Sequence, residues 1–220
     1  MEKEITQNRE DLMELITDPR EIKEDKFPFM VFSDHTSGLL EWIIKVRTTA
    51  QVNHAMWAHK PGYFASQGGT YSEVKMERYL KKGNRLYFVE LKDFTLPQRQ
   101  AILNSINEKL RLPWVKKRYD YLGLVGQAMG FKWINTPWLE YCSEDQPQHL
   151  KKKINNFSEE MQPIIRDIPY HAHPQQLMDY YKQYPKLFNL FGYWDGELNP
   201  IINKRPIDDR IMLSLGRQPL

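Results

Sequence analysis

The chain has 220 residues, of which 41% are hydrophobic and 27% charged, and its formal net charge is +3. This composition excludes a disordered acidic or basic tail protein, and the small net charge gives little basis for a nucleic-acid binder. No apolar run approaches the roughly 18 residues of a membrane span, and the charged first residues contain no apolar core of a secretion signal. We therefore expect a protein that is cytoplasmic as synthesised, with one main domain.

Three parts are expected in chain order. Residues 1–26 are polar and rich in Glu and Lys, so they form either an arm or a short amphipathic helix. The main domain follows over residues 27–195, and residues 196–220 form a C-terminal tail. The apolar positions that would line the short helix are Leu12, Leu15 and Ile16.

The main domain opens with a strand and a helix. Residues 27–33 (FPFMVFS) are apolar and typical of a strand. Residues 37–46 (SGLLEWIIKV) have helical spacing, with Ser37 as the N-cap.

A hairpin is predicted next. Residues 51–58 (QVNHAMWA) alternate, which indicates a strand with His54 and Met56 on one face. Residues 60–62 form a turn, and residues 63–66 return as a second short strand.

Three further elements complete the first half. Residues 72–80 are predicted as a short helix or an irregular stretch, and residues 86–91 (LYFVEL) as a buried strand. Thr95 and Gln98 have capping-box spacing, with a proline in the first turn, so a helix begins there. Its apolar face would consist of Ile102, Leu103, Ile106 and Leu110.

The second half reads as mainly helical. A helix is expected in the later part of residues 119–131, followed by a loop over 133–141. Residues 148–161 have helical spacing, and a further helix begins near Pro174. The stretch beyond it mixes Pro, Gly and aromatic residues and gives no assignment. Together these elements predict an α+β fold.

The single cysteine, Cys142, excludes an intrachain disulfide and a Cys-rich zinc site. It precedes Ser143, Glu144 and Asp145, an acidic stretch suited to the first turn of a helix. A cysteine at a helix N-terminus has a lowered pKa, which favours a nucleophile. The alternative is a buried structural cysteine, since unpaired cysteines are often buried.

A histidine would serve as the base for such a nucleophile. His54 lies on an otherwise apolar strand face, where it is either a hydrogen-bonded core residue or the partner of a thiolate. His171 and His173 form an H-x-H pair that could ligate a metal, but no third ligand stands near them, so they are interpreted as loop residues. No cofactor or metal is expected.

These residues carry a resemblance to a known superfamily. The segments VNHAMWA with His54, YDYLGLVG with Tyr119 and Asp120, and YCSE with Tyr141 and Cys142 occur in the order His, Tyr-Asp, Cys. This order resembles the circularly permuted branch of the NlpC-type, papain-like superfamily, the YiiX/YaeF-like cysteine hydrolases. The resemblance also covers FMVF, SGLLEWIIKV and YFASQGG and spans residues 27–195. It implies a papain-like fold with a small antiparallel sheet packed by helices.

The resemblance assigns roles to several residues. Cys142 would be the nucleophile and His54 the general base. The family's third polar residue follows on the next strand, usually as Glu, Asn or His. That strand has no carboxylate here, and although Gln67 or Ser66 could accept the imidazole N–H, we expect Gln67 as the third catalytic residue and Ser66 as a supporting residue. Three further residues would support the site, or serve only in packing and capping: Tyr119 near the oxyanion, with Asp120 and Tyr141 shaping the site.

The implied activity is hydrolysis of an amide or ester through a thiolate. The implied substrates are peptidoglycan stem peptides or lipid-linked acyl groups. The missing carboxylate also permits an alternative, a catalytically weak or inactive scaffold in a phage particle or a cell-wall-associated assembly, with a protein partner at the termini. A nucleic-acid binder rests only on the basic runs 116–118 and 151–153, which are usually solvated faces.

Overall fold

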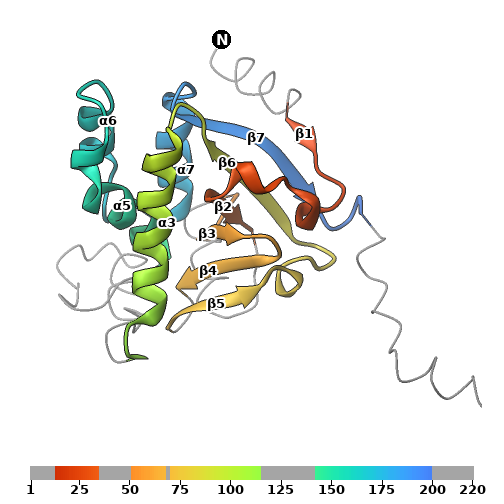
Figure 1. Cartoon of the computed structure of the whole chain (residues 1–220). Helices are drawn as coiled ribbons and strands as arrows, with labels where there is room; N and C mark the ends of the chain where they lie inside the picture. Colours follow the sequence, from red (N-terminus) through yellow and green to blue (C-terminus); the bar gives the residue numbers. More distant parts are fainter. Residues whose placement is uncertain (1–12, 35–50, 68–69, 115–141, 200–220) are drawn as a thin grey trace, which may run out of the picture.

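The computed structural model describes residues 13–34, 51–67, 70–114 and 142–199. These residues form an α+β fold, in which a seven-stranded sheet carries its helices on one face (Figure 1). The α+β class expected from the sequence is therefore confirmed, although the sheet is larger than the small one that was expected.

The strands follow the order β1-β7-β6-β2-β3-β4-β5 across the sheet. The neighbours β1 and β7 run parallel, and every other neighbouring pair is antiparallel. The strands are β1 (Glu14–Leu15), β2 (Phe29–Ser33), β3 (His54–Lys60), β4 (Tyr63–Gln67), β5 (Tyr71–Lys75), β6 (Arg85–Leu91) and β7 (Phe188–Asp195).

The predicted hairpin of β3 and β4 is confirmed, as are the strands β2 and β6. Gly62 makes the tight turn of the hairpin with a φ of 75°, which a residue with a side chain adopts only at a cost. The two sides of β3 belong to different core clusters: Met56 faces one and Trp57 the other. Strand β3 is thus covered on both faces.

The helices gather on the Trp57 face of the sheet (Figure 1). They supply apolar side chains such as Ile102, Leu150 and Leu177 to the core on that side. The described helices are α3 (Leu96–Arg111), α5 (Cys142–Lys152), α6 (Met161–Asp167) and α7 (Pro174–Gln183). The predicted capping box of Thr95 and Gln98 opens α3, and α7 begins at Pro174 as expected.

The opposite face carries the second core cluster, built around Met56, Phe64 and Phe88. The residues after β5 cover it, with a 3₁₀ turn at Met76–Arg78 and the buried ring of Tyr79. Partly buried side chains from the N-terminal segment, including Ile16, also pack there.

Two predicted elements are wrong. Residues 72–80 were expected to be helical or irregular, but β5 and a 3₁₀ turn occupy them, because burial along Tyr71–Lys75 follows a period of two. The helical spacing over 148–161 covers two helices, because α5 ends at Lys152 and α6 begins at Met161. Asn and Ser residues between them favour local turns over helix.

Strand β7 was not predicted, although it joins β1 to β6 near one side of the sheet. Its Gly192 interrupts the apolar pattern, yet a Cβ there would lie 2.9 Å from the backbone oxygen of Glu14 and 2.7 Å from Ile16 Cδ1, so a side chain would force β1 to shift. The described part of the N-terminal arm that packs here is not a helix. Residues Glu14–Leu15 pair with β7 as a strand instead.

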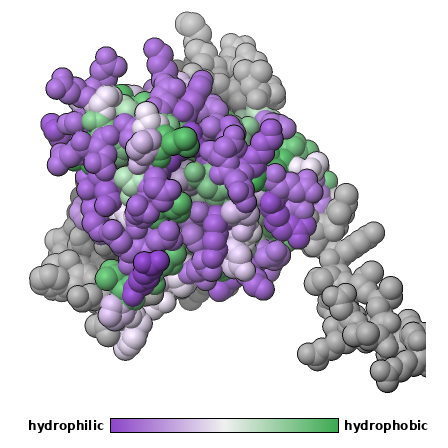
Figure 2. All heavy atoms as spheres, viewed as in Figure 1, coloured by the Kyte–Doolittle hydropathy of each residue, from purple (hydrophilic) through white to green (hydrophobic). Residues whose placement is uncertain are grey.

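Several predictions lie outside the described residues: the helices over 37–46 and 119–131, the loop over 133–141 and most of the C-terminal tail. Within the described part, no helix has the length and apolar character to cross a membrane. Figure 2 shows hydrophilic side chains over most of the visible surface, with smaller apolar areas between them.

Candidate active site

Cys142 is the first residue of α5, as its sequence context predicted. The residue is 3% exposed, and the acidic Glu144 and Asp145 follow in the first turn. The positive end of the helix dipole therefore lies on the side of the thiol.

Helix α5 lies against β3. Gln146 Nε2 donates a 2.9 Å hydrogen bond to the carbonyl of Met56, and the His149 ring lies 6.3 Å from that of Trp57. These contacts place the middle of the helix beside the middle of the strand.

The His54 ring is held by two hydroxyl groups. Its Nε2 lies 2.8 Å from Ser66 Oγ and 3.3 Å from Tyr79 OH, and these two oxygens are 3.2 Å apart. The ring also stacks on the ring of Tyr79, with centroids 5.9 Å apart and planes within 10°. These contacts fix the orientation of the imidazole.

The expectation that Gln67 orients His54 is wrong, because it is Ser66 that contacts the His54 ring. Gln67 is opposite Tyr71 in the pairing of β4 with β5, and alternation turns its side chain to the other face of the sheet. Tyr79 was missed because the stretch that contains it was expected to be helical or irregular. The sequence alone gave no indication that this tyrosine returns over the His54 face.

The alternation of β3 also places the His54 side chain relative to α5. His54 shares its face with Met56 and Tyr79, whereas α5 packs on the face of Trp57. A contact between the thiol of Cys142 and this ring would therefore form around the beginning of β3, rather than across its middle.

Hydrogen bonds tie the beginnings of three elements together. Ser143 Oγ donates to the carbonyl of Ala172, 2.5 Å away, just before α7. Gln175 Oε1, in the first turn of α7, accepts from the backbone N–H of Val52 over 3.2 Å. The first residues of α5, α7 and β3 thus converge on one small region.

The two histidines of the H-x-H pair have separate structural roles. His171 Nδ1 lies 2.6 Å from Glu144 Oε1, and His173 is the N-cap of α7. Burial lowers the pKa of His173, against a weaker opposing effect of Asp179. Within the described ranges, no group of three or more His, Cys, Asp and Glu side chains is placed to hold a metal.

Asn53, just before His54, was not identified from the sequence. Its side-chain amide is buried, and neither its oxygen nor its nitrogen has a hydrogen-bond partner among the described residues. Gln146 Oε1 is in the same situation at the interface of α5 with β3. Three supporting residues of the predicted site, Tyr119, Asp120 and Tyr141, lie outside the described residues.

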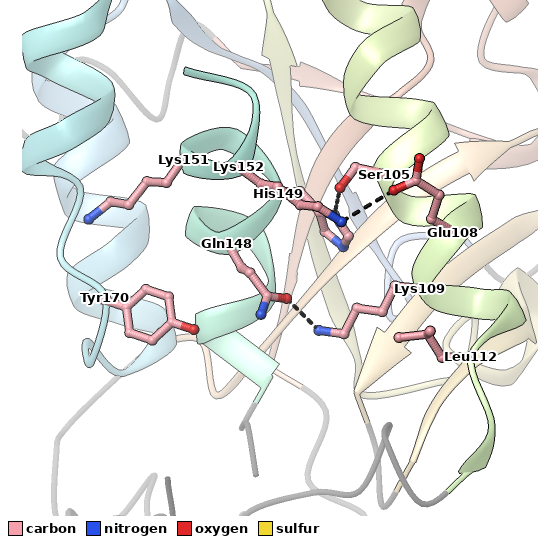
Figure 3. A pocket seen from close by; sticks show the side chains of 9 residues that line it. All are labelled: Ser105, Glu108, Lys109, Leu112, Gln148, His149, Lys151, Lys152 and Tyr170. Carbon is pink, nitrogen blue, oxygen red and sulfur yellow. Dashed lines mark hydrogen bonds and ion pairs between the residues drawn. The ribbon is translucent and has the colours of Figure 1, made fainter. Parts of the chain in front are cut away.

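A cavity of about 570 Å³ opens between α3, α5 and Tyr170 (Figure 3). Figure 3 shows Lys109 directed toward Gln148, and the Ser105 hydroxyl directed toward the His149 ring. The remaining lining residues are Glu108, Leu112, Lys151 and Lys152.

Beside this cavity, Asp145 is the centre of a buried network. Its Oδ1 lies 2.8 Å from Lys109 Nζ and 3.1 Å from His149 Nε2, and His149 Nδ1 lies 2.8 Å from Ser105 Oγ. Burial would raise the pKa of Asp145, but the charges of Lys109 and His149 outweigh it, so this pKa is lowered. Ser105 is fully buried within α3. We therefore interpret the network as a polar link between α3 and α5.

No protein-family model, no curated protein and no solved structure matches this chain significantly.

Proposed function

We propose that this protein is a cysteine hydrolase in which Cys142 is the nucleophile and His54 the general base. The observation that supports it most is that the residue after Cys142 and a residue just before His54 are both hydrogen-bonded at the beginning of α7, through Ser143 to Ala172 and through Val52 to Gln175. The resemblance of the His, Tyr-Asp and Cys segments to the permuted papain-like hydrolases leads to the same two residues.

The reaction would proceed in two steps. The thiolate sulfur of Cys142 bonds to the carbonyl carbon, the C=O electron pair moves to oxygen, and the collapsing intermediate expels the amine or alcohol, which takes a proton from the His54 imidazolium. Water then attacks the thioester while His54 accepts its proton. The C–S bond breaks, and the acid and the thiolate are released.

In this proposal the two nitrogens of His54 have different roles. Ser66 and Tyr79 contact Nε2, so Nδ1 would exchange the proton with the thiol. Ser66 would replace the carboxylate or amide that usually orients the imidazole in the family. A neutral hydroxyl fixes the tautomer but stabilises the imidazolium less than a carboxylate does.

A second candidate is an inactive scaffold that serves as an interaction component, for example in a phage particle or a cell-wall-associated assembly. The observation that favours it is the position of His54 on the face of the sheet opposite to α5. In that case Ser66 and Tyr79 simply satisfy a buried histidine.

The two candidates are separated by trapping the acyl-enzyme. The protein is incubated with panels of peptide amides, acyl amides and esters, and then analysed by intact and peptide mass spectrometry. A hydrolase acquires an acyl group on Cys142 that is lost with time and absent in Cys142→Ala. A chain that releases no product and carries no adduct from any panel is a scaffold.

A further inference from the structure

The cavity between α3, α5 and Tyr170 plays no part in the proposed reaction. Its volume of about 570 Å³ is within the range of about 300–1,000 Å³ that is typical of small-molecule sites. Three lysines line it, Lys109, Lys151 and Lys152, whereas Glu108 is the one acidic residue among the described lining residues. The described lining is therefore basic.

Two of these lysines have carboxylate partners. Lys109 Nζ lies 2.8 Å from Oδ1 of the buried Asp145, and Lys152 Nζ lies 3.2 Å from Oε2 of the exposed Glu108. In each pair the two charges offset one another, so neither of these lysines gives the cavity a net positive charge.

Lys151 differs from them because no described carboxylate forms an ion pair with it. Its Nζ donates to the backbone carbonyl of Ile168 over 2.6 Å, and a neutral carbonyl leaves the positive charge in place. Burial lowers the pKa of Lys151, against a weaker opposing effect of Asp167. An ammonium group has three N–H donors, of which the bond to Ile168 uses one. A partly buried charge of this kind is stabilised when an anion binds to it.

Two neighbours of Lys151 add hydrogen-bonding groups to the same cavity. Lys151 Nζ lies 6.0 Å from the centre of the Tyr170 ring, and Figure 3 shows the tyrosine hydroxyl directed toward Gln148. Gln148 Oε1 accepts from Lys109 Nζ over 2.9 Å, which fixes the orientation of the amide. A tyrosine hydroxyl and a glutamine amide can both donate hydrogen bonds to the oxygens of an anion.

We propose that this cavity binds a small organic anion, with Lys151 as the residue that pairs with its carboxylate or phosphate group. Tyr170 and Gln148 donate to that group, and Leu112 offers apolar surface to the rest of the molecule. The basic run 151–153 is thus more than a solvated face, because its first residue lines a binding site. The site does not involve Cys142.

Three probes test the chemical class of the ligand. Phenyl phosphate and benzoate carry an anionic group on an aromatic ring, and benzyl alcohol carries the ring without a charge. The full chain is titrated at constant ionic strength, and binding is followed by ligand-detected NMR. We expect the tighter of the two anions to bind with a dissociation constant below about 1 mM and to identify the preferred group. Benzyl alcohol should bind at least about tenfold more weakly.

Variants assign the binding to Lys151. Lys151→Met should weaken the binding of the tighter anion at least about tenfold, because it removes a hydrogen bond between charged groups. The matched control is Lys153→Met, whose lysine is not among the lining residues, and it should retain the affinity. Glu108→Gln should strengthen binding about two- to fivefold, because it removes an acidic residue from the lining. Circular dichroism establishes that each variant is folded.

Acetylation of lysines in the parent protein locates the bound anion without any substitution. Saturation with the tighter anion should slow the acetylation of Lys151 and leave that of Lys153 unchanged, as read by peptide mass spectrometry. Equal protection of the two lysines overturns the inference, and so does equal binding of the anions and benzyl alcohol. Unchanged affinity in folded Lys151→Met overturns it as well. Anion binding that depends on Lys151 and survives in Cys142→Ala supports the site, whether or not the chain hydrolyses a substrate.

Discussion

Gln146 of α5 donates a hydrogen bond to the backbone carbonyl of Met56 in β3, over a distance of 2.9 Å. The glutamine is fully buried, so the bond forms in a dry interface where it cannot be replaced by water. The bond fixes the position of α5 along β3. Because Cys142 is one turn before Gln146, this bond also helps to fix where the thiol lies.

Gln146→Leu tests this role. The variant keeps the volume of the side chain but leaves the Met56 carbonyl without that donor, so we expect a loss of about 1–3 kcal/mol in the free energy of unfolding. The reactivity of Cys142 toward iodoacetamide should fall as well, since α5 is no longer fixed in its position along β3. Urea denaturation and alkylation rates measure the two effects.

The control for Gln146 is Gln100→Leu, because among the described residues the Gln100 side chain bonds to exposed Asn104 on the surface of α3. Its unfolding free energy should stay within about 0.5 kcal/mol of the parent. Equal stability of the Gln146 and Gln100 variants would contradict the importance of the buried bond.

Ser66→Ala and Tyr79→Phe test whether the hydroxyl groups orient the His54 ring. Each variant removes one hydrogen bond to Nε2 and should slow the His54-dependent alkylation of Cys142 by about tenfold, the equivalent of about 1.4 kcal/mol. Tyr79→Phe keeps the stacked ring and so isolates the hydroxyl.

The matched control for these variants is Ser72→Ala, directly opposite Ser66 in β5. It should leave the alkylation rate unchanged. A rate that is equally insensitive to Ser66→Ala would show that the hydroxyl does not act through the imidazole.

Lys109→Met should destabilise the protein strongly. It removes the 2.8 Å ion pair with Asp145 and leaves a buried carboxylate without its lysine, a change that typically costs about 3–5 kcal/mol. Adding Asp145→Asn should restore part of the loss, because no charge is then left behind. Thermal and urea unfolding of the single and double variants measure this coupling.

Lys152→Met is the comparison for Lys109→Met, since its ion pair with Glu108 is exposed on the same helix pair. Exposed pairs contribute at most about 1 kcal/mol. If the two lysine variants lost a similar amount of unfolding free energy, the Lys109–Asp145 pair would not act as a buried ion pair.

His59 predicts a pH dependence of stability. Burial lowers its pKa, although the nearby carboxylate of Glu73, 2.9 Å from Nε2, opposes this shift. Because the folded pKa is below the unfolded value of about 6.5, the contribution of His59 to stability is complete above that pH. It is lost as the pH falls below about 6.5 toward the folded pKa.

His59→Gln should flatten this dependence, because glutamine can still donate to Glu73 but does not titrate. The midpoints of urea unfolding are compared at pH 7.5 and at pH 5.5 for both proteins. If the variant loses as much stability as the parent between these two values, another group is responsible for the slope.

The sequence predicted those helices and strands whose signals come from residues that are close together in the chain. The alternation around His54, the capping box of Thr95 and the helical start at Cys142 all depend on neighbouring residues, and the structure confirms them. Strand β7 could not be recognised, since Gly192 is explained only by the close approach of Ile16 from the other end of the chain.

The candidate site depends on both local and distant relationships. Cys142 and His54 were proposed from residue type and context, and Ser66 was one of two residues that could accept the imidazole N–H. Tyr79 was not, because its contact with His54 depends on how the chain turns after β5. Asn53 is notable only because its amide is buried without a described partner, and a sequence does not reveal burial of that kind.

The rate of alkylation of Cys142 by iodoacetamide as a function of pH tests the Cys142–His54 pair most directly. We expect a plateau that is reached well below the ordinary thiol pKa of about 8.5. His54→Ala should abolish it, while the exposed His171→Ala should leave it in place. A normal titration near 8.5 that is unchanged in His54→Ala would contradict the pair and leave the fold as a binding scaffold.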